Sequence, residues 1–245
     1  MDAPYSFAFQ PIVDVGRGVV AGFEALVRGP NGESAASVLG AFSRDELHQF
    51  DMAARQRAIE LSATLTLPQQ TCLNLNLLPD SLDVCGLSAL TSTVEMAARC
   101  GIAPERIMLE ISETETIANF SRFVEMVDAS RSRGVKFAID DFGAGYAGLN
   151  LLAHFQPEAI KIDMQLVREI WHRGPRQAIV RGVITTCTDL GIDIVAEGVE
   201  TMNEYQWLRD EGVSQFQGYL FARPAFQALP TVTFPLEFLV PSYAV

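Results

Sequence analysis

The sequence is poor in cysteine and histidine, the residue types from which proteins build disulfide frameworks and most zinc sites. Its 245 residues include four cysteines and three histidines, namely Cys72, Cys85, Cys100, Cys187, His48, His154 and His172. No two cysteines form a CxxC pair, and no two histidines lie at metal-ligand spacing. We therefore expect reduced thiols in a cytoplasmic protein, with no disulfide framework and no zinc site.

Basic side chains and long apolar runs are also scarce. Eighteen Lys and Arg stand against 30 Asp and Glu, so the formal net charge is −12. This balance excludes a nucleic-acid polymer as partner, because a polyanion needs an extended basic face. It does not exclude a small phosphate ligand, which metal ions and one or two basic side chains can neutralise locally. No secretory signal begins the chain, and no apolar run approaches the roughly 20 residues that span a bilayer, so we expect no membrane segment.

The order of predicted elements indicates the fold. Residues 6–15 and 19–28 read as two strands around a short turn at 16–18, which forces them to be antiparallel. From residue 45 onward, helices alternate with strands, and they are expected over 45–65, 87–100, 116–133, 146–153, 165–171, 176–190 and 203–211. The strands that follow them read TCLNLNL, RIMLEIS, VKFAIDD, AIKID, IDIVAEG and FQGYLF.

These strands are about eight in number, and most are apolar on both faces, as buried parallel strands are. The pattern predicts an α/β protein with a single domain over residues 1–245, a TIM-like (β/α)8 barrel. The opening hairpin should leave one barrel strand antiparallel to the rest. Residues 29–37 (GPNGESAAS) read as a loop.

Polar side chains stand where six of these strands should end. They are Glu24, Asn74, Glu110, Asp140, Asp141, Lys161 and Glu197. One charged residue at a strand end is ordinary, and each of these could by itself be a helix cap or a solvated turn. Six strands that end this way favour convergence on one point, as loops converge at the C-terminal mouth of a parallel barrel. Carboxylate and amide oxygens gathered there suit Mg²⁺ or Mn²⁺.

The residue types fit a phosphoesterase with two metal ions, which needs an oxygen ligand between the ions. We expect one of Asp140 and Asp141 to bridge the ions and the other to serve the second ion. Glu24, Asn74 and Glu110 would complete the first ion, and Glu197 the second. Lys161 would bind the attacking water or a phosphate oxygen, and Arg28, four residues beyond Glu24, could bind a phosphate.

The chain resembles the EAL family of cyclic di-GMP phosphodiesterases over nearly its whole length. The resemblance is carried by FQPIVD, FEALVR, LNLN, LEISE, IDDFGAGY, IKID, VAEGVE and QGYLFARP. The segment FEALVRGPNGESAA is most similar to EAL modules fused to blue-light-sensing flavin domains. The resemblance implies a barrel with one reversed strand, and hydrolysis of cyclic di-GMP to linear pGpG with Mg²⁺ or Mn²⁺. Ca²⁺ should bind the same oxygens and inhibit, because its geometry is looser.

By motif position, the resemblance also implies roles for individual residues. The metal ligands would be Glu24, Asn74, Glu110, Asp140, Asp141 and Glu197, with Lys161 and Glu197 as catalytic residues. The substrate-binding residues would be Gln10, Arg28, Asp163 and Gln217. Glu113 would anchor the DFGAGY loop, and Glu200, a second anchoring residue, would lie beside the metal site.

The sequence departs from the family at two places, since Asn76 stands where the family has a serine, and Tyr146, at the end of the DFGAGY loop, is followed by AGL where the family has YSSL. The family's dimer contacts include this loop, and we expect a homodimer, with a sensory or regulatory domain in cis or in trans. Three functions stay open: an active phosphodiesterase, a catalytically silent cyclic di-GMP receptor, and a protein-interaction module that no longer uses the nucleotide. The intact ligand set favours the first.

Overall fold

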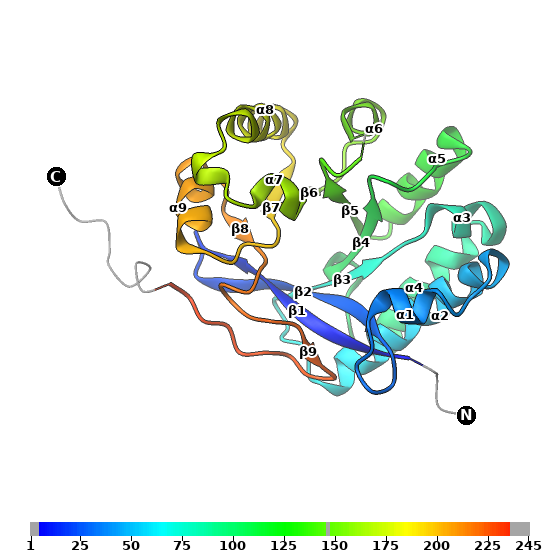
Figure 1. Cartoon of the computed structure of the whole chain (residues 1–245). Helices are drawn as coiled ribbons and strands as arrows, with labels where there is room; N and C mark the ends of the chain where they lie inside the picture. Colours follow the sequence, from blue (N-terminus) through cyan, green and yellow to red (C-terminus); the bar gives the residue numbers. More distant parts are fainter. Residues whose placement is uncertain (1–4, 146–147, 236–245) are drawn as a thin grey trace.

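Eight strands form a closed ring with helices around its outside (Figure 1). The structure, a computed structural model, describes residues 5–145 and 148–235. The ring strands are β1 (Ser6–Asp14), β2 (Val19–Arg28), β3 (Cys72–Asn76), β4 (Ile107–Ser112), β5 (Lys136–Phe142), β6 (Ala159–Ile162), β7 (Asp193–Ala196) and β8 (Gln215–Phe216). The predicted TIM-like barrel is therefore confirmed.

The reversed strand is β1. It pairs antiparallel with β2 on one side and with β8 on the other, whereas each neighbouring pair from β2 to β8 is parallel. The turn between β1 and β2 includes Gly18 at φ +66°, a left-handed conformation that glycine adopts without steric cost. A ninth strand, β9 (Ala225–Phe226), pairs with the other end of β1 and lies outside the ring.

The helices follow the predicted alternation with small shifts at their ends. They are α1 (Ala35–Leu39), α2 (Arg44–Thr64), α3 (Pro79–Cys85), α4 (Ser88–Arg99), α5 (Phe120–Arg131), α6 (Gly148–His154), α7 (Met164–Val167), α8 (Gly174–Leu190) and α9 (Met202–Asp210), with 3₁₀ turns at Pro104–Arg106 and Ile170–His172. None of the described helices has the length and apolar character that a bilayer crossing requires.

Side-chain caps explain two of the shifts. The predicted loop over 29–37 ends early, because the Ser34 hydroxyl accepts a hydrogen bond from the Ser37 amide and starts α1. Helix α5 starts later than predicted, where the Asn119 side chain accepts from the Arg122 amide at 3.1 Å. The predicted strand FQGYLF was too long, since β8 ends at Phe216.

The barrel wall is buried on both faces, as the apolar strands predicted. Every residue of β1 and of β6 is buried. Three charged side chains share this interior, Glu24, Glu110 and Lys161. Burying a charge without a partner costs several kcal/mol, so these groups must satisfy one another or a ligand. The cysteines whose side chains are described, Cys72, Cys100 and Cys187, are free thiols, as expected.

Among the described glycines, Gly218 has the least room for a Cβ atom, and this allows a test of the fold. A Cβ at this position would lie 2.0 Å from the Val199 carbonyl oxygen. That backbone has little room to move, because the Val199 amide donates to the Gln217 carbonyl and the Val199 carbonyl accepts from the Leu220 amide. We expect Gly218→Ala to lower the free energy of unfolding by about 1–3 kcal/mol, measured by urea denaturation.

Gly182→Ala is the matched control. Gly182 lies within α8, and a Cβ there would meet nothing within 4 Å. This substitution should raise the free energy of unfolding by about 0.5–1 kcal/mol, because alanine has the better helix propensity. Equal effects of the two substitutions would show that the contact between Gly218 and Val199 does not constrain the fold.

Candidate active site

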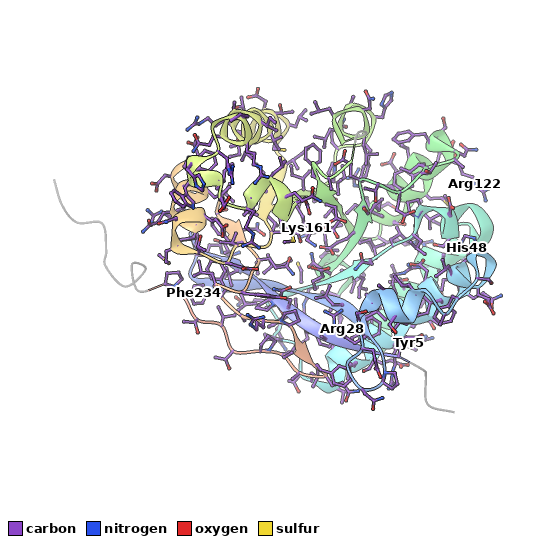
Figure 2. The ribbon with its side chains drawn as sticks, in the orientation of Figure 1. Tyr5, Arg28, His48, Arg122, Lys161 and Phe234 are labelled. Carbon is purple, nitrogen blue, oxygen red and sulfur yellow. The ribbon has the colours of Figure 1, made fainter. Side chains whose placement is uncertain are left out.

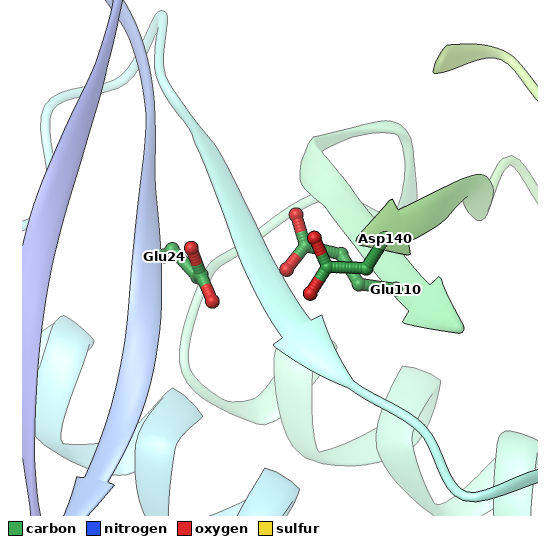
Figure 3. Close-up of side chains that lie close together, drawn as sticks. All are labelled: Glu24, Glu110 and Asp140. Atoms are coloured by element: carbon green, nitrogen blue, oxygen red, sulfur yellow. The ribbon is translucent and has the colours of Figure 1, made fainter. Parts of the chain in front are cut away.

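A buried ammonium group lies among four carboxylates at the centre of the barrel. Lys161 on β6 is 1% exposed, and Figure 2 labels it inside the ring. Its Nζ lies 3.1 Å from Glu24 Oε2, 3.1 Å from Glu110 Oε1, 2.9 Å from Asp140 Oδ1 and 2.8 Å from Glu197 Oε1. Figure 3 shows the carboxyl groups of Glu24, Glu110 and Asp140 turned toward one another from β2, β4 and β5. The predicted convergence of strand ends is present in this structure.

An irregularity in β5 brings two adjacent aspartates to the same place. Successive side chains of a regular strand point to opposite faces, which would separate Asp140 from Asp141. The pairing of β5 with β6 shifts register between Ile139 and Phe142, and Asp141 adopts φ +54°. This left-handed turn costs a non-glycine residue about 1–2 kcal/mol. It allows Asp141 to join Asp140 at the mouth of the barrel.

The carboxylates form two groups that could each hold a cation. Glu24, Glu110 and Asp140 form one, and Asp140, Asp141 and Glu197 form the other, with ligand oxygens in each group within 4.8 Å of one another. Asp140 belongs to both groups, which is the arrangement that a ligand shared between two metal ions requires.

The charge of the cluster fits two divalent ions. Its five carboxylates, on Glu24, Glu110, Asp140, Asp141 and Glu197, total −5 when ionised, and Lys161 returns +1, so −4 is left. Two divalent cations would balance that charge. One oxygen, Glu110 Oε2, is buried and has no hydrogen-bond partner among the described residues, so it is available to a cation.

Burial and the neighbouring carboxylates raise the pKa values of three acidic side chains of the cluster. Burial raises the pKa of Glu110 to about 8; Lys161 opposes the rise and the neighbouring carboxylates add to it. Burial also raises the pKa of Glu197 well above its usual value, and burial together with Asp140 and Asp163 raises that of Asp141. Without a cation, the raised pKa values of Glu110 and Glu197 favour a proton on the cluster at neutral pH.

A cavity of about 580 Å³ opens onto this cluster. Eight of the residues predicted for the site line it, namely Gln10, Glu24, Asp140, Asp141, Asp163, Glu197, Glu200 and Gln217. The lining residues from β2, β3, α1 and α2 are mostly apolar, among them Leu26, Leu39, Phe50, Ala54 and Leu75, with Asp51, Arg55 and Asn76 beside them. Oxygen ligands at one side and an apolar wall at the other suit a small ligand that carries both a phosphate and a flat apolar group.

Hydrogen bonds orient the remaining predicted residues at the cavity. Gln217 Nε2 donates to Glu24 Oε2 at 2.8 Å, and at 3.4 Å to Gln10 Oε1. Asp163 caps α7 by accepting from the Gln165 amide at 2.8 Å. Asn74 donates Nδ2 to Glu110 Oε1 at 2.7 Å, so its amide would have to turn over to present its oxygen to a cation.

Two predicted residues do not join the cluster. Arg28 is not among the cavity-lining residues; its Nη1 donates to the adjacent Val27 carbonyl at 2.7 Å, and Figure 2 labels it away from Lys161. Glu200 lies at the cavity rim, where its side chain is 41% exposed and pairs with Arg168 at 2.9 Å. The structure thus brings Glu200 beside the site, but its carboxylate binds an arginine and not a loop backbone.

Glu113 lies against the backbone of the DFGAGY loop, where it was predicted. Its carboxylate accepts hydrogen bonds from the amides of Gly143 at 2.6 Å, Gly145 at 3.3 Å and Gly148 at 2.7 Å. Gly143 has φ +99°, and a Cβ there would lie 2.3 Å from Leu166 Cδ1, so a larger residue does not fit. Of the two positions that depart from the family's YSSL, Ala147 lies outside the described residues and Gly148 begins α6.

Another buried glutamate, Glu204, was not predicted from the sequence. Its carboxylate binds the amides of Glu169, Glu200 and Thr201. The pattern Thr201-x-x-Glu204 is a capping box, and that signal could have pointed to it.

Comparison with known proteins identifies the family. A family model described as the EAL domain matches residues 5–224, most of the chain and all of the carboxylate cluster. This chain belongs to the EAL domain family. The resemblance inferred from the sequence motifs is confirmed.

Three proteins illustrate what this EAL domain is similar to. The "Blue light- and temperature-regulated antirepressor BluF" of Escherichia coli (strain K12) is 37% identical over 232 residues, which cover 94% of this chain and 56% of BluF. The "Cyclic di-GMP phosphodiesterase PdeB" of Shewanella oneidensis is 32% identical over 170 residues, or 69% of this chain and 20% of PdeB. The chain thus spans little more than half of BluF and a smaller part of PdeB.

The third protein is a solved structure, Klebsiella pneumoniae BlrP1 in a manganese and cyclic di-GMP complex. It aligns with a TM-score of 0.87 at 42% identity, over 92% of this chain and 57% of BlrP1. Its calcium and cyclic di-GMP complex aligns with the same TM-score at 41% identity, over 94% of this chain and 58% of BlrP1. The expected divalent-cation cofactor is supported by these complexes together with the two carboxylate groups. Inhibition by Ca²⁺ stays a prediction.

The raised pKa of Glu110 predicts that cation binding releases protons. Below about pH 8 this carboxyl group is protonated in the metal-free domain, whereas a cation ligand must be ionised. Mn²⁺ affinity should therefore rise with pH by about tenfold per unit for each proton released, and level off once the pH exceeds the pKa. Titration calorimetry at pH 7 in two buffers of different ionisation enthalpy measures the number of protons. A flat pH profile with no proton release would contradict this assignment of Glu110.

Proposed function

We propose that this EAL domain is a divalent-cation-dependent phosphodiesterase that hydrolyses cyclic di-GMP to linear pGpG. The observation that carries the proposal is the cluster of five carboxylates around Lys161, complete at each position that the family motifs imply. The named activity of PdeB and the ligands of BlrP1 support the choice of substrate.

The charge of the cluster explains why the reaction would need cations. A phosphodiester is an anion, and five closely spaced carboxylates repel it unless positive charge is added. When bound, two divalent cations supply Lewis-acid stabilisation of the attacking and the leaving oxygen. Glu24, Asn74 and Glu110 would hold one cation, Asp141 and Glu197 the other, with Asp140 shared between them.

Lys161 acts in this proposal as a permanent hydrogen-bond donor. Burial would lower the pKa of its ammonium group, but the carboxylates of Asp140, Glu110, Glu197 and Glu24 raise it well above its usual value. Without bound cations, the lysine therefore keeps its proton through the neutral range. It can orient the attacking water or a non-bridging phosphate oxygen, with Glu197 at 2.8 Å from the same ammonium group.

The substrate would occupy the cavity with one phosphate at the carboxylate cluster. Gln10, Gln217 and Asp163 line the wall and present polar groups to it. Arg28 would need a different side-chain conformation to bind a phosphate. The apolar wall, with Leu39, offers a surface on which a base could lie.

A second function has one observation in its favour. BluF carries the printed name of an antirepressor, and it matches 94% of this chain. A catalytically silent cyclic di-GMP receptor, or a protein-interaction module without nucleotide, would fit that relationship. The remaining parts of the proposal, a single domain over 1–245, a homodimer, a cytoplasmic location and a sensory or regulatory domain in cis or in trans, rest on the family resemblance and on the partial coverage of BluF and BlrP1.

A product assay separates these functions. The purified domain is incubated with cyclic di-GMP and Mn²⁺, Mg²⁺, Ca²⁺ or EDTA, and the nucleotides are resolved by chromatography. We expect linear pGpG with Mn²⁺ or Mg²⁺, little product with Ca²⁺ and none with EDTA. Bound but intact nucleotide would indicate a receptor, and the absence of both binding and product would indicate an interaction module.

Replacing Lys161 tests its proposed role. Lys161→Met should lower kcat by about 10²–10⁴-fold and change KM by only a few fold, since the hydrogen bond to the reacting oxygen gains strength in the transition state. The matched control is Lys136→Met, which alters the only other lysine of the sequence, at the opposite end of β5 from the cluster. An unchanged kcat with a raised KM in Lys161→Met would make the lysine a substrate contact instead.

A further inference from the structure

Glu204 is a buried carboxylate that lies outside the cavity, between two loops that border it. It is 1% exposed and occupies the first turn of α9. Its Oε2 accepts from the amides of Glu200 and Thr201, each at 3.0 Å, and its Oε1 accepts from the amide of Glu169, also at 3.0 Å. Arg168 Nη1 lies 3.6 Å from the same Oε1.

Helix capping accounts for only part of this arrangement. A capping box needs one hydrogen bond from the glutamate to the N-cap amide, here that of Thr201. The other capping box of the described chain, Ser43 with Glu46 on α2, shows the simple case, because both hydrogen bonds of the exposed Glu46 side chain go to Ser43. The bond from Glu204 to Glu169 instead reaches a different loop.

The two loops that Glu204 joins both carry residues of the site. The loop after β6 begins at Asp163 and includes α7 and Glu169, and the loop after β7 begins at Glu197. They are in close contact, since a Cβ on Gly198 would lie 2.5 Å from Met164 Cβ. Movement of one loop against the other would therefore move Glu197 relative to Asp163.

The backbone at Glu169 indicates that this contact is held under strain. Glu169 has φ +56°, a left-handed conformation that costs a residue with a side chain about 1–2 kcal/mol. Its amide is the group that donates to Glu204. A strained residue persists when its surroundings stabilise it, and this hydrogen bond is one of the stabilising contacts, beside the Glu169 carbonyl that accepts from the His172 amide and the side chain that pairs with Arg173.

The same loop after β7 is tied to the other side of the cavity. The Val199 amide donates to the Gln217 carbonyl at 3.1 Å, and the Gln217 side chain donates to Glu24. A backbone shift at Glu200 would therefore move residues of both cation groups. The largest effect would be on Glu197, which is in the same loop.

We propose that Glu204 is a positioning residue for the cation held by Asp140, Asp141 and Glu197, because its carboxylate ties the loop after β6 to the loop after β7. This role rests on the two-cation chemistry proposed above. Glu204 touches neither cation nor substrate, and it acts by holding the backbone that presents Glu197.

Replacing Glu204 with glutamine separates its two roles, the capping of α9 at Thr201 and the contact with the loop after β6 at Glu169. Burial would raise the pKa of Glu204, but the backbone hydrogen bonds from Glu169, Glu200 and Thr201 lower it below its usual value, so both oxygens are acceptors at neutral pH. A glutamine has one acceptor oxygen. If that oxygen keeps the cap at Thr201, the NH₂ group faces the Glu169 amide, donor against donor, and the tie between the loops is lost.

The test compares Glu204→Gln with Glu46→Gln, which alters the other capping box and no loop contact. Mn²⁺ binding is titrated by calorimetry into each metal-free protein, and thermal unfolding is recorded without metal. We expect wild-type protein to bind two Mn²⁺, and Glu204→Gln to weaken one of the two binding steps by about tenfold while the other changes little. Glu46→Gln should leave both steps as in wild type.

Three results would overturn the positioning role. They are a folded Glu204→Gln protein with both Mn²⁺ steps unchanged, an equal loss in Glu46→Gln, and wild-type protein that binds fewer than two Mn²⁺. If Glu204→Gln does not fold, Arg168→Gln replaces it. Arg168, in the loop after β6, donates Nη2 to Glu200 Oε1, in the loop after β7, and so joins the same two loops at the protein surface. Arg168→Gln should weaken the same step by a smaller factor, and unchanged Mn²⁺ affinity in that variant would also overturn the proposal.

The product assay on the same preparations distinguishes failure of the positioning role from failure of the proposed phosphodiesterase activity. Wild-type protein that binds two Mn²⁺ and forms no pGpG would overturn the phosphodiesterase. The positioning role would still be supported in that case if Glu204→Gln weakened one Mn²⁺ step.

Discussion

The structure depends on the balance between one buried ammonium group and the carboxylates around it. Lys161 contacts four acidic side chains from four different segments of the barrel. Without that cation, like charges would face one another in a water-poor interior, and the strand ends that carry them would be driven apart. One lysine is nevertheless too little positive charge for five carboxylates, and burial, together with the neighbouring Glu24 and Asp140, raises the pKa of Glu110. The deficit is what gives the site its affinity for divalent ions.

Some of the proposed cation-binding side chains lie on the barrel strands, and others lie where the strands lead into loops. Glu24 and Glu110 lie within strands, whose backbone is held by pairing on both sides. Asp141 and Glu197 lie where strands give way to loops, so their positions depend on contacts made outside the sheet. Two buried glutamates, Glu113 and Glu204, supply such contacts by accepting backbone amides of the loops. Glu24 and Glu110 are therefore held by strand pairing, whereas Asp141 and Glu197 depend on side chains that hold the neighbouring loops.

The sequence alone was sufficient for most of the barrel and for the cluster itself. Apolar runs, most of them apolar on both faces and each ended by a polar residue, predict parallel strands whose ends meet, and Glu24, Glu110, Asp140 and Lys161 do meet. The short turn between β1 and β2 was enough to predict the reversed strand.

Other features could not be read from the sequence, because they depend on local backbone geometry. The irregularity at Asp141 is a dihedral angle that the residue types around it do not specify. Arg28 lies at the very end of β2, where the direction of a long side chain is set by the loop that follows. Glu200 and Glu204 are both acidic and four residues apart; which of them faces the loop backbone depends on how α9 docks against the barrel.

The closure of the ring between β1 and β8 also has a consequence for how the chain folds during synthesis. Because β1 lies between β2 and β8, the ring cannot close until the residues near 216 have been made, and β8 meets β1 through only two residue pairs, at Val13 and Asp14. Until then the nascent chain carries an open sheet with β1 as one edge and β7 as the other. Gln217 reaches Glu24 across 193 positions of sequence, so this part of the site forms at closure. Contacts of such long range form slowly, and an unfinished chain presents two unpaired edges that other proteins or chaperones can bind.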